Sequence, residues 1–157
     1  MPEGELRGAG TITDFLFGGR AVFTVQSRRT QKHHTYRVIR VPDDGKAGTP
    51  LRWWVSLMTG SDNSDPKSFT YIGMIAGRNG GFPRFVLTAK SPMPLTAAPV
   101  AGFKYVLDAV VLGDITRMAR FHFFHEGRCA VCNRPLTDPV SIQRGIGPVC
   151  LQEVTRA

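Results

Sequence analysis

The sequence predicts a protein of the α+β class: a small antiparallel sheet or partly open barrel, one packing helix, and a compact C-terminal unit. Three observations predict this fold. Short segments of alternating apolar and polar residues fill the first half of the chain. One later segment, residues 100–111, has helical periodicity. All three cysteines lie between residues 129 and 150. The 157 residues include 42% hydrophobic side chains, which is enough for a packed core.

Five segments before residue 91 are expected to form strands. Residues 20–27 alternate most clearly, with Ala21, Phe23 and Val25 on one side of the chain. The other expected strands are residues 34–41, 52–58, 69–75 and 84–88. Segments rich in Pro, Asp, Asn and Gly separate them, and such residues form turns. Short strands at this spacing favour an antiparallel meander or a small barrel.

A single helix is expected to pack on this sheet. Apolar residues recur at helical spacing from Val100 to Val111, Pro99 suits the first turn, and Gly113 provides the end. Residues 115–124 are predicted to form a second short helix or strand. We therefore expect a β-rich domain with its helix over residues 1–114 and a metal-binding module over residues 115–157.

The cysteines and a nearby histidine have the spacing of a metal site: His125-x3-Cys129-x2-Cys132-x17-Cys150. Two cysteines separated by two residues can bind one tetrahedral Zn²⁺ through both sulfurs. The glycines and proline before Cys150, and the helix-forming residues after it, place this thiol in the first turn of a helix. Three thiolates and one imidazole leave no position for water or substrate, so the expected Zn²⁺ is structural.

Other interpretations of these residues stay open from the sequence. The cysteines can be free and buried. A redox CxxC pair usually follows a strand in a βαβ pattern, which is not seen here, and a zinc deaminase needs His-x-Glu and Pro-Cys-x-x-Cys. His122 is the alternative fourth ligand; His125 is preferred because it is closer to the CxxC pair and lies outside the aromatic run.

The segment HEGRCAVCNRPLTDPVSIQRGIGPVC resembles a zinc-binding module of many uncharacterised bacteriophage and bacterial proteins. The shared features are CxxC-x-R-x-L, a downstream Pro and Ser, and a closing Gly-Ile-Gly-Pro-x-Cys, with Pro135 as a departure between the Arg and the Leu. The upstream block RWWVSLMTGSDNSDPKSFTYIGMI is similar, more weakly, to the same phage proteins. The resemblance implies a treble-clef-like zinc unit and a mobile-element origin. It supplies no activity.

The net charge of +8 is concentrated in two segments, residues 28–52 and 117–144, which carry the whole excess of basic residues. Such clustering favours a polyanionic partner, either nucleic acid (DNA or RNA) or an acidic host protein surface. Exposed aromatic rings beside cations suit single-stranded nucleic acid, and of the two adjacent tryptophans we expect Trp54 to be exposed. The expected binding residues are Arg28, Arg29, Lys32, Arg37, Arg40, Arg52, Trp54, Arg128, Arg134 and Arg144.

The sequence thus predicts a non-catalytic, phage-type nucleic-acid-binding protein with a structural zinc site. The alternative is a phage effector that binds protein and inhibits or modulates a host nucleic-acid-handling or defence complex. No paired carboxylates or nucleophile–base arrangement indicate an enzyme, and no small-molecule substrate is evident. No apolar run reaches membrane-spanning length and no secretory leader is seen, so we expect the protein in the cytoplasm of a bacterial host cell.

Overall fold

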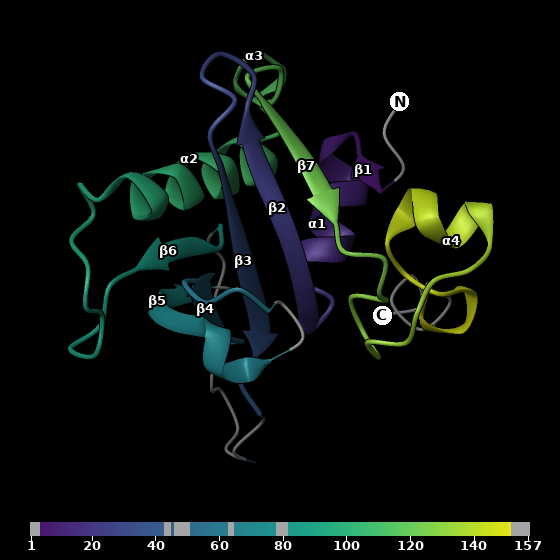
Figure 1. The fold of residues 1–157 in the computed structure, drawn as a ribbon, viewed down its shortest axis with the longest axis horizontal. Coiled ribbons are helices and arrows are strands. Elements are labelled where there is room, and N and C mark those ends of the chain that lie inside the picture. Colours follow the sequence, from purple (N-terminus) through teal and green to yellow (C-terminus); the bar gives the residue numbers. More distant parts are fainter. Residues whose placement is uncertain (1–3, 43–44, 46–50, 63–64, 78–81, 152–157) are drawn as a thin grey trace.

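A computed structural model describes residues 4–42, 45, 51–62, 65–77 and 82–151 of the chain (Figure 1). Several of the predicted turn residues, at positions 43, 44, 63 and 79–81, lie outside the described residues. Among the described residues, no helix is both long enough and apolar enough to cross a bilayer.

The fold is α+β, as predicted, and its sheet is open. Seven strands lie in the order β1-β7-β2-β3-β4-β5-β6, and every neighbouring pair is antiparallel. The strands are β1 (Glu5–Leu6), β2 (Arg20–Ser27), β3 (His33–Arg40), β4 (Trp53–Met58), β5 (Phe69–Ala76), β6 (Arg84–Val86) and β7 (Phe121–His125). The helices are α1 (Ala9–Leu16), the short η1 (Pro66–Ser68), α2 (Ala98–Leu112), α3 (Ile115–Met118) and α4 (Pro139–Arg144).

Helices α1 and α2 cover one face of the sheet and enclose the core; in Figure 1 they lie behind β2, β3 and β7. Phe23 of β2 stacks on Phe123 of β7, with ring centroids 4.5 Å apart, and α2 adds Phe103 against the same cluster. The helix ends where the sequence predicts, because Gly113 adopts the left-handed conformation (φ 64°) that a helix C-cap favours. The buried apolar residues of the strands belong to this one core.

Strand β7 lies inside the sheet, between β1 and β2, although its residues come from the segment 115–157 that was expected to form a separate module. Phe121, Phe123 and His125 alternate inward and are buried. Three residues of the cysteine-containing segment, Cys129, Ala130 and Ile146, also belong to the one hydrophobic core. The C-terminal segment is thus continuous with the sheet and its core.

Candidate metal centre and nucleic-acid interface

Three cysteines meet in the C-terminal segment. The sulfur atoms of Cys129, Cys132 and Cys150 all lie within 4.8 Å of one another. A tetrahedral ion bound through Zn–S bonds of about 2.3 Å holds its sulfurs about 3.8 Å apart, so a small movement closes the three thiols on one ion. This donor set can hold a metal ion.

The local backbone explains how the cysteines converge. The CxxC pair lies in a tight loop closed by hydrogen bonds from Cys129 N to Arg134 O (2.8 Å) and from Asn133 N to Cys129 O (2.9 Å). Asn133 adopts φ +65°, a conformation that asparagine tolerates better than most residues. Residues 148–151 are helical, so Cys150 lies in the first turn of a helix, as the sequence predicts.

Nearby backbone N–H groups and the cysteines themselves set the electrostatics of the centre. Burial raises the pKa of Cys129, but hydrogen bonds from backbone N–H groups, including those of Val131 (3.4 Å) and Gly147 (3.3 Å), outweigh it and lower the pKa overall. Burial, followed by contacts with the other two thiols, raises the pKa of Cys150 to about 12. Three adjacent thiolates repel one another, so a bound cation is what allows all three to ionise together.

The loop that carries Cys129 and Cys132 packs against α1 and the start of β2. Ala130 is fully buried, its carbonyl accepts a hydrogen bond from Arg20 N (2.6 Å), and its N–H donates to Gly145 O (3.0 Å). Gly145 in turn lies against the ring of Phe15 in α1. The position of the three cysteines is therefore coupled to the core of the sheet.

His125 does not join the cysteines in this structure, which corrects the expected ligand set. It is buried at the end of β7, next to Phe15, and both of its ring nitrogens bond to backbone. Nδ1 accepts a hydrogen bond from Gly127 N (2.8 Å), and Nε2 contacts the carbonyl of Ile142, which requires the Nε2–H tautomer. The imidazole thus connects β7 to the loop and to α4.

Replacing His125 by alanine tests its role. We expect the variant to keep one metal ion per chain and to lose about 2–4 kcal/mol of stability, because a buried ring and two hydrogen bonds are removed. Metal analysis and thermal unfolding of the same preparation measure the two effects. A folded variant without metal would instead identify His125 as a ligand.

The alternative histidine, His122, points to the other side of β7. Its Nδ1 lies 2.7 Å from Glu5 Oε1, and its ring stacks on Phe124 with centroids 5.7 Å apart. Among the described residues a fourth ligand is therefore not evident. A cavity of about 330 Å³ adjoins the three cysteines, and Arg134, Asp138 and Ser141 are among the residues that line it.

The face of the sheet opposite α1 and α2 carries cations and aromatic rings in two neighbouring rows across the strands. One row runs Arg20, Ile39, Trp54, Met74 from β2 to β5, and the next runs Val22, Arg37, Ser56, Tyr71. Cavities of about 580 and 430 Å³ lie on this face, and Arg37 and Ile39 line both. Trp54 is 41% exposed, as predicted, whereas Trp53 is 2% exposed. We call the surface formed by Arg20, Arg37, Trp54, Tyr71, Lys90 and Arg128 the sheet platform.

Arg37 occupies the centre of the sheet platform. Its guanidinium lies 4.7 Å from the ring centroid of Phe69, and its Nε is buried with no hydrogen-bond partner in the described part of the chain. Burial lowers the pKa of this group from the usual arginine value. At the edge of the platform, Arg128 contributes a cation from the metal-binding loop.

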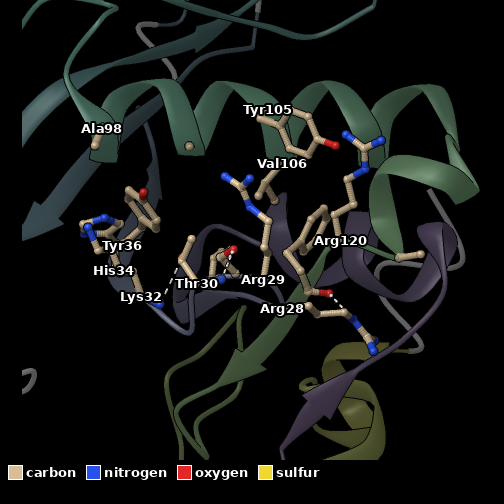
Figure 2. Close-up of a pocket in the computed structure, with 15 residues that line it drawn as sticks. Arg28, Arg29, Thr30, Lys32, His34, Tyr36, Ala98, Tyr105, Val106 and Arg120 are labelled. Atoms are coloured by element: carbon tan, nitrogen blue, oxygen red, sulfur yellow. Dashed lines mark hydrogen bonds between the residues drawn. The ribbon is translucent and has the colours of Figure 1, made fainter.

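The remaining predicted binding residues do not form one surface with the sheet platform. Arg28, Arg29 and Lys32 lie on the β2–β3 turn, about 26 Å along β2 from Arg20, and line a separate cavity (Figure 2). The other four are dispersed: Arg40 ends β3, Arg52 precedes β4, Arg134 lines the cavity beside the cysteines, and Arg144 ends α4. The predicted binding residues are thus divided among the sheet platform, the β2–β3 turn and dispersed positions.

Sequence reasoning did not include Arg20, Lys90 or Arg120 among the binding residues. The alternation of β2 contains the signal for Arg20, because it shares a face with Val22 and Thr24, away from buried Ala21 and Phe23. Arg120 reaches the β2–β3 turn only through the pairing of β7 with β2, which joins residues almost 100 positions apart. No local pattern indicates that neighbour.

The chain was compared with protein families, curated proteins and solved structures. No curated protein and no solved structure matched the chain. The segment 119–154, which contains β7, the three cysteines and α4, is similar to a family of unknown function, DUF6011.

Proposed function

We propose that this protein binds single-stranded nucleic acid on the sheet platform, and that a structural Zn²⁺ in the cysteine centre holds the edge of that platform. The observation that carries the proposal is the pair of neighbouring rows on the face opposite α1 and α2, where Arg37 and Arg20 lie beside Trp54 and Tyr71. Single-stranded sites combine cations for phosphates with rings on which bases stack.

The charge of the platform supports a polyanionic ligand. Arg20, Arg37, Lys90 and Arg128 line its two cavities, and of the carboxylates that the structure describes, Glu126 alone is among the lining residues of either cavity. Glu126 accepts a hydrogen bond from Thr24 (2.8 Å). Among the described residues, none of the four cations forms an ion pair with a carboxylate. Their charge is therefore available to phosphates.

The choice of zinc and of a structural role follows from the ligands and their surroundings. Thiolate ligands favour Zn²⁺ over harder cations. Cys129 is 1% exposed and its neighbours Ala130 and Ile146 belong to the core, so an ion here stabilises the packing of the loop against α1. The proposal therefore assigns no catalytic step to the centre. Its likeness to a module of bacteriophage proteins supports a phage-type role in a bacterial cell.

Salt dependence tests the proposal. We expect a short fluorescently labelled single-stranded oligonucleotide, DNA or RNA, to bind with a log K versus log [salt] slope of about −3, because four cations each contribute ~0.7. Fluorescence anisotropy at several salt concentrations measures the slope. Absence of binding at low salt would overturn the proposal and favour a protein partner.

Variants locate the site. Trp54→Ala should weaken binding roughly 5- to 150-fold, the loss of one stacked base, and leave the salt slope unchanged. Lys90→Ala should instead reduce the slope by about 0.7. Lys104→Ala is the matched control, because Lys104 lies exposed on α2, which covers the opposite face, where it pairs with Asp108. Equal losses in Lys90→Ala and Lys104→Ala, with no loss in Trp54→Ala, would show that binding depends on net charge alone.

A further inference from the structure

The cavity beside the β2–β3 turn has a volume of about 920 Å³. It lies between α2, this turn and the start of β7, on the side of the sheet that the helices cover (Figure 2). Four fixed cations line it: Arg28, Arg29, Lys32 and Arg120. In the part of the chain that the structure describes, no carboxylate lines the cavity and none of these cations forms an ion pair. An uncompensated cluster of this kind attracts an anion.

The cavity is held in shape by backbone contacts. Arg28 N donates to Arg120 O (3.0 Å), and the turn itself is closed by Ser27 N to Lys32 O (2.9 Å). Figure 2 shows the guanidinium groups of Arg29 and Arg120 extending toward α2, on the side of Tyr105, whereas Arg28 turns away. Two guanidinium groups thus face the same space from two different elements.

Two features of α2 favour an anion in the cavity, one beside the guanidinium groups and one at its far end. The hydroxyl of Tyr105 is buried and has no hydrogen-bond partner among the described residues, which is costly unless a ligand supplies one. Ala98, the first residue of this 15-residue helix, lines the far end of the cavity, and the helix has no side-chain cap at its N-terminus. The positive end of the helix dipole is therefore available to an anion there.

The rest of the lining is apolar and aromatic. Val25, Val106 and Phe121 form part of the wall, and the ring of Tyr36 lies beside His34 at the end opposite Arg120. A free inorganic anion would use the guanidinium groups and leave this apolar surface in contact with water. A ligand that joins a doubly charged phosphate to a flat ring uses both.

We propose that this cavity binds a nucleotide through its terminal phosphate monoester, with Arg29, Arg120 and Tyr105 as phosphate ligands. The ligand is a free mononucleotide or the 5′-phosphorylated end of a strand, which share this chemistry. The site is independent of the sheet platform, because it lies on the other face and at the far end of β2.

Isothermal titration calorimetry with the full-length, metal-loaded protein tests the proposal, with adenosine 5′-monophosphate and adenosine as probes. We expect the monophosphate to bind at least about 10-fold more tightly than adenosine, because each charge-assisted hydrogen bond contributes about a factor of 10. A companion titration compares 5′-phosphorylated with 5′-hydroxyl single-stranded oligonucleotides. A phosphate preference in either titration supports the site and identifies the source; no preference in both overturns it.

Variants of the lining residues separate this site from a general charge effect. Arg29→Ala/Arg120→Ala should abolish the phosphate preference, whereas Arg84→Ala/Lys104→Ala, which removes two cations outside the cavity, should preserve it. Tyr105→Phe should reduce monophosphate affinity about 3- to 10-fold without lowering the unfolding temperature, because the hydroxyl has no internal partner. A normal phosphate preference in the Arg29/Arg120 variant would contradict the proposal. Trp54→Ala should leave this preference intact even where it weakens strand binding.

Discussion

Cys132→Ser is expected to release the metal ion and to unfold the segment that follows β7. Serine is a poor ligand for Zn²⁺, and metal binding is the main source of folding energy for a loop-rich unit of this size. The free energy of Zn²⁺ binding to isolated zinc-finger peptides is roughly 10–16 kcal/mol. Loss of the ion should therefore destabilise this segment far more than an ordinary substitution does. Because Cys129 and Ala130 belong to the core, we expect the sheet to lose several kcal/mol as well.

Metal analysis and hydrogen exchange measure this result. The amides of residues 128–147 should lose most of their protection, while those of β3 and β4 should lose less, since these strands lie away from the loop in the sheet order. Val149→Ser is the matched control: Val149 is 69% exposed next to Cys150, and the substitution should leave metal content unchanged. A Cys132→Ser protein that still holds one metal ion per chain would refute the ligand assignment.

Gly145→Ala is expected to destabilise the protein by about 2–5 kcal/mol. The residue ends α4 with φ +72°, where a side chain costs about 1–2 kcal/mol. A Cβ here would also lie 2.4 Å from the ring of Phe15, which is fully buried, and such overpacking costs a further 1–3 kcal/mol or so. Chemical denaturation measures the loss.

Gly147→Ala is the matched control for this substitution. A Cβ on Gly147 would meet no atom of the described, non-adjacent residues within 4 Å, and the N–H that donates to Cys129 Sγ is retained. We expect a change of no more than about 0.5 kcal/mol. Equal effects at the two positions would show that the contact between Gly145 and Phe15 does not couple the metal-binding unit to the core.

The local patterns in the sequence predicted most of the sheet and α2 but missed α1. The alternation of β2 and the helical spacing of α2, with its Gly113 end, are signals that a short window contains. Helix α1 has eight residues and no side-chain cap, and it carries two threonines, which are weak helix formers. Ile12, Phe15 and Leu16 hold it against the sheet, so tertiary packing decides its structure.

The position of His125 shows why spacing alone misled the ligand assignment. A histidine four residues before a CxxC pair has an imidazole that can bind Zn²⁺, and it is near enough along the chain to reach the same ion. It also continues the inward alternation of Phe121 and Phe123, which places its ring in the core beside Phe15. This alternation within β7 is the local pattern that indicates a buried position for His125. The pairing of β7 with β1 and β2, which is a long-range feature, was not available from any window.

The intrinsic fluorescence of the two tryptophans tests nucleic-acid binding on the sheet platform most directly. Trp54 is 41% exposed between Ile39 and Met74, whereas Trp53 is 2% exposed and packs against Phe17. Titration with an unlabelled single-stranded oligonucleotide at low salt should quench the emission of Trp54 through base stacking, and Trp54→Phe should remove this quenching while Trp53 continues to emit. Binding that leaves wild-type emission unchanged, or no binding at all, would contradict the account.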